Sequence, residues 1–409
     1  MKKLLDLYLD AYRGLPREVW FLSAVLLVNR SGTMVLTFLT LYLTLELGWT
    51  LTLAGQVLSI YGVGHLAGAW IGGWLCDRIG GLRIQFLSLL LSGLGMFVLE
   101  HLRTPTGVML ATFFVATTAE SFRPANGATL AAFSPPHLRT RAVALNRMAL
   151  NLGFAFGPAV GGWLAVRDYS LLFWVDGVTC ILAAFLLRAL LPHEPIEATD
   201  ESAAGQRAAL ELHPMKDWIF LAFLGLVVLL TLGFFQGWST YPVFLNEVYG
   251  LAESQFGLLM TLNAVLILAF EMILTHRAEV FRPLSVVGAG TFLFGLGMTV
   301  LLFGNHWMLA VFSVVIWTTG EMLAAPFAGG WVANRAGPKH RGKYMGLYTM
   351  AWGLGFIIAP SGGAWIYQHF GPNTLWLATG LLGAVTWIGF ELLDRRIRQL
   401  PIAAVAEST

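Results

Sequence analysis

Apolar segments long enough to cross a membrane recur along the whole chain, separated by charged or Pro- and Gly-rich residues. A membrane helix needs about 20 mainly apolar residues, and a helix satisfies its own backbone hydrogen bonds in lipid. Each segment therefore predicts one membrane-spanning helix. The pattern predicts twelve, at residues 18–44, 51–75, 84–101, 106–131, 142–166, 169–191, 217–244, 254–275, 284–304, 307–331, 343–368 and 372–394.

One long polar segment interrupts this pattern and divides the helices into two groups of six. It lies at residues 192–215 and reads PHEPIEATDESAAGQRAALELHPM. We expect it to be a cytoplasmic linker between two six-helix bundles, at residues 1–191 and 216–394. A cytoplasmic tail at residues 395–409 follows the second bundle. The predicted fold class is an all-α membrane protein.

The basic residues alternate between the two predicted sides of the membrane. Lys and Arg residues in short loops stay on the cytoplasmic side. With the N-terminus placed inside, all but five of the 25 Lys and Arg residues fall in predicted cytoplasmic segments. Arg103 and Arg167 fall on the other side, and Arg30, Arg123 and Arg147 lie inside predicted helices. Because a miscounted helix would invert this bias downstream, it supports twelve spans with both termini in the cytoplasm.

The composition agrees with a membrane protein. Hydrophobic residues make up 57% of the 409 residues and charged residues 12%, whereas soluble domains carry about 25% charged residues. These values argue against a soluble enzyme, a secreted protein and a nucleic-acid-binding protein. The net charge of +2 says little about partners. We expect a multi-pass protein of the inner cell membrane.

The two halves repeat each other where polar and helix-breaking residues are densest. Residues 117–120 read TTAE, and residues 318–321 read TTGE at an offset of 201. Residues 152–163 and 354–365 share Leu-Gly-Phe, a Pro, a Gly and a Trp at an offset of 202. Parallel repeats of this kind occur in secondary transporters, whose site lies near the membrane midplane between the repeats. The repeat therefore predicts a transporter.

A few ionisable residues lie inside the predicted helices, where each costs about 2.5–3.5 kcal/mol on insertion scales. Glu120 and Arg123 are three residues apart and share a helix face, so they could pair locally. Glu321 has no basic residue within four positions, which suits a proton carrier because burial favours the neutral carboxyl. The alternative for all of them is a fixed interhelical ion pair, most of all for the three nearer helix ends, Arg147, Asp176 and Glu271.

Other intramembrane polar residues are candidates to line a substrate cavity. Arg30 lies deep in its helix and could bind an anionic group of a ligand or pair with Glu120. Uncharged polar residues could contact a substrate, but such residues more often form hydrogen bonds between membrane helices. This group contains Gln56, His65, Asn151, Gln236 and Asn263.

Glycine and proline patterns suggest close helix packing and hinges. Gly64, Gly68 and Gly72 repeat every four residues, and so do Gly153, Gly157 and Gly161. Small residues at this spacing let helices approach closely, either as sliding seams between the halves or as ordinary packing. Pro158 and Pro360 occupy matched positions, and each removes a backbone hydrogen bond, which fits kinks with a gating role.

With these residues in view, the chain resembles the major facilitator superfamily, and within it the twelve-helix drug:proton antiporters of bacteria. Residues 73–80 (GWLCDRIG) are similar to the loop signature G-x-L-x-D-R-x-G, although Gly81-Leu82 replaces the usual Arg-Lys. Residues 123–127 (RPANG) are similar to R-x-x-Q-G, with Asn126 in place of Gln. Residues 153–162 are similar to the exporters' antiporter motif, although Ala144 stands where a glycine is expected.

The resemblance implies roles for these residues. It implies a conformational latch and hinge at Gly73, Asp77, Arg78 and Gly80 together with Gly153, Gly157, Pro158, Gly161 and Pro360. It also implies that Arg123 takes part in proton coupling with Glu120 and Glu321. As polar residues within the predicted helices, Arg30, Gln236, Asn126 and Asn151 are the substrate-cavity candidates. The second-half copy of the loop signature, at residues 275–279, is nearly erased, so a matching latch there is not expected.

These observations together predict a secondary transporter that works by alternating access. The most specific reading is proton-coupled export of lipophilic or cationic small molecules. Proton-coupled uptake or export of an endogenous metabolite, such as a peptide, sugar or lipid-like compound, is the alternative. A membrane-embedded enzyme or receptor is remote, since the chain has no P-loop, no H-E-x-x-H and no metal-spaced His/Cys cluster. We expect a monomer with no catalytic residue, metal or cofactor, whose partners are a small-molecule substrate, protons and the bilayer.

Overall fold

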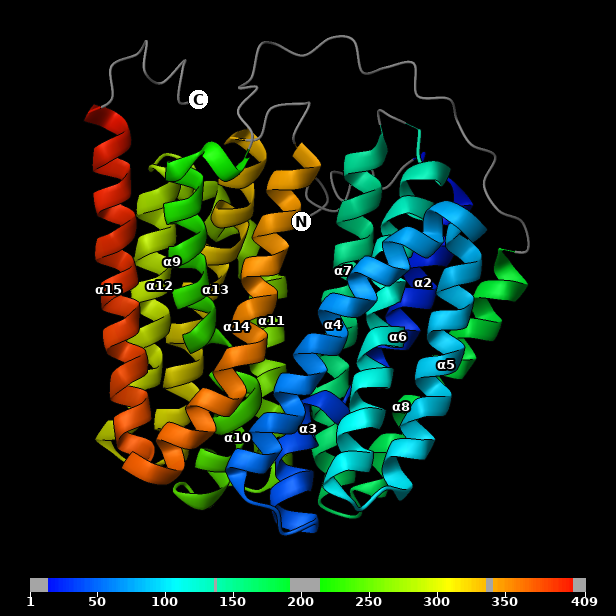
Figure 1. Ribbon diagram of the computed structural model, residues 1–409, viewed down its shortest axis with the longest axis horizontal. Helices are drawn as coiled ribbons and strands as arrows, with labels where there is room; N and C mark the ends of the chain where they lie inside the picture. The colour runs from blue at the N-terminus through cyan, green and yellow to red at the C-terminus, as the bar shows by residue number, and fades with distance from the viewer. Residues whose placement is uncertain (1–13, 136–137, 192–213, 336–340, 400–409) are drawn as a thin grey trace, which may run out of the picture. The chain divides into compact units, whose positions relative to one another are not determined.

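The computed structural model describes residues 14–135, 138–191, 214–335 and 341–399. Over these residues the chain forms helices and no strands (Figure 1). Most of the predicted linker and most of the predicted tail lie outside the described residues. The fold class predicted from the hydropathy pattern, an all-helical protein, is confirmed for the described part of the chain.

The first predicted helices form where the apolar segments lie, with one interruption. Helix α2 ends at Gly32 and α3 begins at Val35, so the segment predicted as one helix is broken. The elements of this half are α2 (Arg17–Gly32), α3 (Val35–Leu41), the π-helix η1 (Tyr42–Glu46), α4 (Leu51–Ile79), α5 (Gly81–His101), α6 (Pro105–Phe133), α7 (Arg139–Ala165) and α8 (Ser170–Leu190).

The second half repeats this arrangement, including the interruption. Its first long segment is divided at Phe235 into α9 and α10. The elements are the 3-10 turn η3 (Pro214–Lys216), α9 (Trp218–Phe234), α10 (Gln236–Glu247), α11 (Glu253–Ala278), α12 (Pro283–Val300), the 3-10 turn η4 (Leu301–Phe303), α13 (Trp307–Arg335), α14 (Arg341–Phe370) and α15 (Pro372–Gln399).

Among the described residues, nine helical segments are long and apolar enough to cross a membrane. Three further helices, α4, α6 and α14, have 29, 29 and 30 residues. Glycine and polar residues dilute their apolar sequence. The count of twelve spans and the cytoplasmic position of both termini stay predictions.

The chain divides into two compact units, each of which takes in a short segment from the other predicted half. The first unit comprises Met1–Tyr42, Ile60–Thr199 and Glu253–Ala264. The second comprises Leu43–Ser59, Asp200–Ala252 and Val265–Thr409. The boundaries predicted from the sequence, at residues 191 and 216, stay a prediction.

The same helix pairs pack in each unit. In the first unit α5 packs against α6 and α8, and α2 packs against α7 and α8. In the second unit α12 packs against α13 and α15, and α9 packs against α14 and α15. The order of the helices along the chain makes these pairs equivalent. The repeat seen in the sequence is therefore also a repeat of helix packing.

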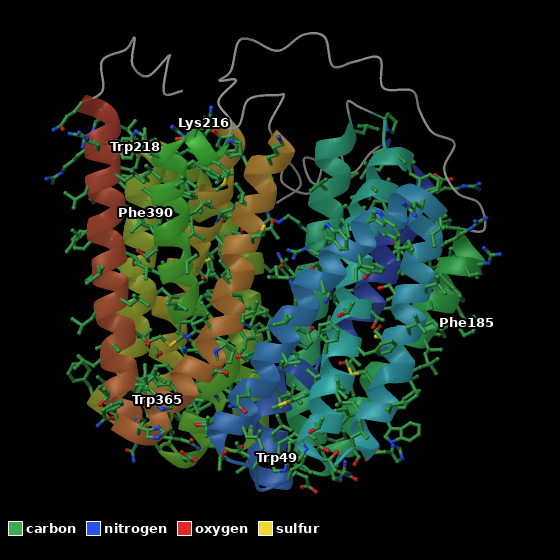
Figure 2. All side chains as sticks on the ribbon, viewed as in Figure 1. Trp49, Phe185, Lys216, Trp218, Trp365 and Phe390 are labelled. Carbon is green, nitrogen blue, oxygen red and sulfur yellow. The ribbon has the colours of Figure 1, made fainter. Side chains whose placement is uncertain are left out.

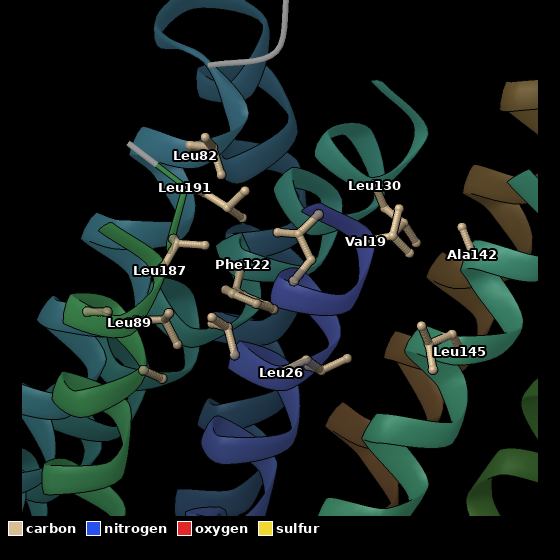
Figure 3. Packing of buried hydrophobic residues seen from close by; sticks show 14 of the residues in the cluster. Val19, Leu26, Leu82, Leu89, Phe122, Leu130, Ala142, Leu145, Leu187 and Leu191 are labelled. Carbon is tan, nitrogen blue, oxygen red and sulfur yellow. The ribbon is translucent and has the colours of Figure 1, made fainter. Parts of the chain in front are cut away.

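Each unit has its own apolar core. In the first unit Leu26 and Phe122 belong to a cluster of buried side chains from α2, α5, α6, α7 and α8 (Figure 3). In the second unit Phe223 and Phe390 belong to an equivalent cluster from α9, α12, α13, α14 and α15. Because lipid is as apolar as these side chains, their contribution to holding membrane helices together comes from close van der Waals packing rather than from removal from water.

Large apolar side chains also cover the outer surface of the bundles. Phe185 on α8 is an example and points away from its bundle (Figure 2). The exposed set on α8 also includes Trp174, Val178 and Leu182, and α15 exposes Leu377, Leu381, Val385, Ile388 and Leu392. Water-soluble monomers rarely expose apolar patches of this extent. Contact with lipid accounts for them.

The glycine repeats allow close packing inside the first unit. A Cβ atom added at Gly64 would lie 2.7 Å from the Phe113 carbonyl oxygen, so α4 approaches α6 there. A Cβ atom added at Gly153 would lie 2.5 Å from the Cβ atom of Arg30, so α7 approaches α2 in the same way. These stripes are packing seams between helices of one unit. Their role as hinges stays a prediction.

Candidate functional site

Glu120 on α6 lies between two basic side chains of the first unit. Arg123 Nη1, one turn further along α6, donates to Glu120 Oε1 at 3.1 Å. His65 Nε2, on α4, lies 3.2 Å from Glu120 Oε2. The Glu120 side chain is 12% exposed, whereas that of Arg123 is 68% exposed. The predicted local pair of Glu120 and Arg123 is present, and His65 joins it from a second helix.

The glycines of α4 bring His65 within reach of the carboxylate. Gly64 and Gly68 lie directly against the backbone of α6, with no room for a side chain. The hydroxyl of Ser121 on α6 donates to the Gly68 carbonyl oxygen at 3.0 Å and fixes the register of the two helices. Sequence analysis placed His65 in the membrane but could not pair it with Glu120, because that pairing depends on which helices pack together.

This arrangement can respond to a proton. An ionised Glu120 attracts Arg123 and accepts a hydrogen bond from it, and a protonated His65 would be attracted in the same way. A proton on the carboxyl removes its negative charge and so weakens its attraction for Arg123. Because Arg123 is largely exposed, it could then turn to another partner. The cluster therefore has the parts that a proton-operated switch requires.

Arg30 on α2 lies apart from this cluster. Among the described residues, the ion-pair partners of Glu120 are His65 and Arg123, and Arg30 is not one of them. The Arg30 guanidinium carbon lies 5.7 Å from the centre of the Phe154 ring on α7. Its Nε atom is buried and has no hydrogen-bond partner in the described part of the protein. Of the two predicted roles, pairing with Glu120 is not observed, and binding an anionic group stays open.

Asp176 on α8 holds the break between α2 and α3. The residue is 2% exposed, and its Oδ2 atom accepts from the backbone N–H groups of Met34 and Val35, each at 3.3 Å. Cys180 Sγ lies 3.7 Å from the other carboxylate oxygen, Oδ1. The sequence interpretation of Asp176 as a fixed ion pair is replaced here by a carboxylate that binds backbone amides. Those amides need a partner because α3 starts there.

The amide candidates take different positions. Gln236, at the start of α10, donates from Nε2 to the carbonyl oxygens of Leu232 and Ala359 and accepts from Thr240, at 2.8–3.1 Å. The bond to Ala359 joins α10 to α14, which is the interhelical role weighed for Gln236. Asn126 on α6 is buried, and its Oδ1 atom has no partner among the described residues. Asn151 on α7 is partly buried.

In the second unit, Glu321 lies partly buried on α13.

An aromatic cluster surrounds the break between α9 and α10. The Phe235 and Phe356 rings stack with centroids 4.5 Å apart, and Trp352 packs edge-on against Phe234 at 5.4 Å. Sequence analysis counted the aromatic residues without identifying this cluster. The adjacent Phe pair directly before Gln236 was the available signal.

The loop signature is only partly described. The side chain of Asp77 lies outside the described residues. Arg78 is exposed, and its guanidinium carbon lies 3.9 Å from the Trp74 ring centre. Gly80 has φ +93°, a conformation that favours glycine, and it precedes the first residue of α5. Gly73 has open space around it. A latch function for the loop signature stays a prediction.

The predicted gating prolines lie within continuous helices. Pro158 falls inside α7 and Pro360 inside α14, and both helices extend well beyond them.

Across the described ranges no group of three or more His, Cys, Asp or Glu residues could hold a metal ion.

A buried ionic cluster that the hydropathy pattern did not reveal joins three helices of the second unit. Asp217, directly before α9, accepts from Arg335 Nε and Nη2 at 2.6 and 2.7 Å and from the Tyr344 hydroxyl at 2.9 Å. It also caps α9 by accepting from the Phe220 N–H at 3.0 Å. The cluster ties together the ends of α9, α13 and α14. An Asp immediately before an apolar helix was the available signal.

Comparison with known proteins agrees with this architecture. The family model of the Major Facilitator Superfamily matches residues 19–251 and 223–403. The chain is similar to the multidrug resistance protein MdtH of Proteus mirabilis (strain HI4320), with 26% identity over 351 residues that cover 83% of this chain and 85% of that protein. It is also similar to a Na(+), Li(+), K(+)/H(+) antiporter of Planococcus maritimus, with 25% identity over 363 residues, 81% and 85% of the two chains.

A solved structure has the same fold. The crystal structure of a POT family transporter in complex with 5-aminolevulinic acid matches with a TM-score of 0.80 and 15% sequence identity, covering 94% of this chain and 97% of that one. At this identity the likeness concerns the fold alone. The family model, in contrast, spans almost the whole sequence. The chain therefore belongs to the Major Facilitator Superfamily, and it is a multi-pass membrane transporter rather than an enzyme.

Proposed function

We propose that this protein is a proton-coupled exporter of lipophilic or cationic small molecules that works by alternating access. We place it in the inner membrane as a monomer with twelve spans and both termini in the cytoplasm. The observation that carries the proposal is the position of Glu120, a largely buried carboxylate held by His65 and Arg123 at 3.2 and 3.1 Å. Intramembrane carboxylates in such clusters are typical of proton relays.

Proton coupling follows from exchange of partners at Glu120. A proton arriving at the carboxyl neutralises it, and Arg123 loses its attraction for that oxygen. The freed guanidinium biases the protein towards one of its two conformations, because the two states differ in the contacts that Arg123 makes. Glu321 occupies the matching position of the sequence repeat. We assign it a second protonation event in the same cycle.

The substrate class rests on the apolar and aromatic side chains of the second unit. The cluster of Phe234, Phe235, Trp352 and Phe356 offers ring faces to apolar compounds and, by cation–π attraction, to cations. The names of two relatives, a multidrug resistance protein and a cation/proton antiporter, support export in exchange for protons.

The second candidate function is proton-coupled transport of an endogenous metabolite. The Arg30 guanidinium, which makes no ion pair among the described residues, favours a substrate that carries an anionic group. The fold shared with a POT family transporter in complex with 5-aminolevulinic acid is compatible with this alternative. In metabolite uptake the substrate and the protons would cross the membrane in the same direction. In drug export they would cross in opposite directions.

Transport into proteoliposomes under an imposed pH gradient tests the proposal. Antiport predicts that a lipophilic cation such as ethidium moves opposite to the protons, and that Glu120→Gln and Glu321→Gln both abolish the gradient-driven component. Glu279→Gln is the matched control, because Glu279 is 63% exposed and its ion pair within the described ranges is a local one with His276. Wild-type rates in Glu120→Gln would remove that residue from the mechanism. Movement of substrate together with protons would favour the metabolite alternative.

A further inference from the structure

A polar cavity lies inside the first unit, separate from the Glu120 cluster. Side chains of α2, α3, α4, α5, α6 and α8 line it. Its polar lining includes Asn29, Arg30, Tyr61, Thr112 and Asp176, and its apolar lining includes leucine and methionine side chains such as Leu36 and Met96. The cavity therefore presents charged, hydrogen-bonding and apolar surfaces to one enclosed space.

Two buried donors in this cavity lack acceptors in the described part of the protein. Arg30 Nε is one, and the hydroxyl of Thr112, a residue that is 1% exposed, is the other. A buried polar group without a partner costs about 1–3 kcal/mol, and a charged group costs more. The guanidinium group also offers its remaining N–H donors in a fork that matches a carboxylate. These groups call for an acceptor that the protein does not supply.

The acidic residue of the cavity does not meet this need. Asp176 Oδ2 is committed to the amides of Met34 and Val35, and no ion pair joins Asp176 to Arg30 among the described residues. Asn29 Nδ2 is likewise committed, since it donates to Cys180 Sγ at 3.2 Å. Among the described residues that line the cavity, Arg30 Nε and the Thr112 hydroxyl are buried donors without an acceptor and can serve an incoming group.

We propose that this cavity binds a monocarboxylate with a short apolar tail. The carboxylate would accept from Arg30 and from the Thr112 hydroxyl, and the tail would lie against the leucine and methionine side chains. A cation is disfavoured by Arg30. A dianion such as phosphate is disfavoured by the carboxylate of Asp176, which lines the same space. One negative charge therefore fits better than two.

Binding of this ligand couples to a proton. The cavity lining includes one cation, Arg30, and one anion, Asp176. An added carboxylate leaves one negative charge unbalanced in a medium of low dielectric constant. Proton uptake at Asp176 restores neutrality. The titratable groups near Asp176 are Arg30 from α2, Tyr61 from α4 and Cys180 from α8 itself, whereas α5 and α6 contribute the hydroxyls of Ser88, Ser92 and Thr112. Affinity should therefore rise as the pH falls.

Thermal unfolding of the purified full-length protein in detergent tests the proposal without requiring transport, so its outcome is independent of the proposed function. The probes are sodium butyrate, the neutral isostere butyramide, and sodium chloride at the same concentration. We expect stabilisation by butyrate alone, and more at mildly acidic than at mildly alkaline pH. Octanoate distinguishes two kinds of ligand. If it binds more tightly than butyrate, the ligand is a longer amphiphile whose carboxylate end enters the cavity. If it binds more weakly, the ligand is a free short-chain acid.

Variants locate the site. Arg30→Gln should weaken butyrate binding by about tenfold or more, as loss of a charge-assisted hydrogen bond predicts, and Thr112→Val should weaken it by a smaller factor. Asp176→Asn should keep butyrate binding but remove its pH dependence. Arg167→Gln is the control, because it removes one positive charge that lies over Trp163 outside the cavity. If Arg30→Gln does not fold, Thr112→Val still decides the question. Equal stabilisation by butyrate and butyramide, or unchanged butyrate affinity in Thr112→Val and Arg30→Gln, would overturn the proposal.

Discussion

Gly257 on α11 lies directly against the carbonyl oxygen of Pro158 on α7, within the first unit. Gly55 on α4 stands in the same relation to Pro360 on α14 within the second unit, where an added Cβ atom would lie 2.6 Å from the Pro360 carbonyl oxygen. Both glycines and both prolines are related by the 202-residue offset of the sequence repeat. The repeat therefore extends to single contacts between helices.

Larger side chains at these glycines should destabilise the protein. Gly257→Val or Gly55→Val would force backbone atoms apart, and overpacking of this kind typically costs about 1–3 kcal/mol. A lower midpoint of thermal unfolding in detergent is the expected result for both variants. Gly225→Val is the control, since a Cβ atom there would meet no described atom within 4 Å apart from the neighbouring residues and backbone of its own helix. An equal loss in all three variants would attribute the effect to helix propensity rather than to the contact.

Replacing Arg123 should leave the thermal stability of the protein nearly unchanged but remove the coupling of transport to protons. The side chain is 68% exposed, and exposed ion pairs typically contribute about 0.2–1 kcal/mol, so Arg123→Gln should unfold close to the wild-type temperature. Its transport in proteoliposomes should nevertheless lose its dependence on the pH gradient. Arg78→Gln, which removes another exposed arginine of the same unit, gives the comparison for stability alone. Retained gradient-driven transport in Arg123→Gln would argue against the proposed exchange of partners.

The buried cluster around Asp217 should be essential for the stability of the second unit. Arg335 and Asp217 are 8% and 3% exposed, and breaking a buried ion pair by removing one partner typically costs about 3–5 kcal/mol. Arg335→Gln should therefore lower the unfolding temperature strongly. Tyr344→Phe, which removes one hydrogen bond, should cost about 0.5–1.5 kcal/mol. Arg395→Gln on the exposed end of α15 should have little effect, and a similar change in all three variants would contradict this ranking.

For folding, the carboxylate of Asp176 should matter as a hydrogen-bond acceptor. Asp176→Ala leaves the amides of Met34 and Val35 without their acceptor, which typically costs about 1–3 kcal/mol for a buried group. Asp176→Asn keeps an acceptor oxygen at the same place and should be less damaging. Unfolding temperatures of the two variants, measured side by side, check this order. A more stable alanine variant would show that the break between α2 and α3 does not depend on this contact.

The residues of the candidate site differ in how far sequence could predict them. The spacing of Glu120 and Arg123 predicted their pairing, because helix geometry places residues three apart on one face. His65 lies on another helix, and its contact with Glu120 depends on the close approach of α4 to α6. Asp217, Arg335 and Tyr344 come from three helices, and hydropathy does not reveal which helix ends meet. The breaks at Gly32 and Phe235 fall at short polar and glycine-containing stretches, residues 29–33 and 236–237, which were too short to interrupt the apolar segments predicted as single spans.

The sequence by itself determined the helical class, the positions of the helices, the repeat and the superfamily. Lipid imposes that result, since a spanning segment must be apolar and must satisfy its backbone internally. The tertiary structure decided which polar groups meet: His65 with Glu120, Asp176 with the start of α3, and Arg30 with an enclosed cavity instead of with Glu120. Those contacts depend on which helices pack together and on the glycines that let the helices approach closely. Hydrophobic periodicity carries no information about which polar groups then meet.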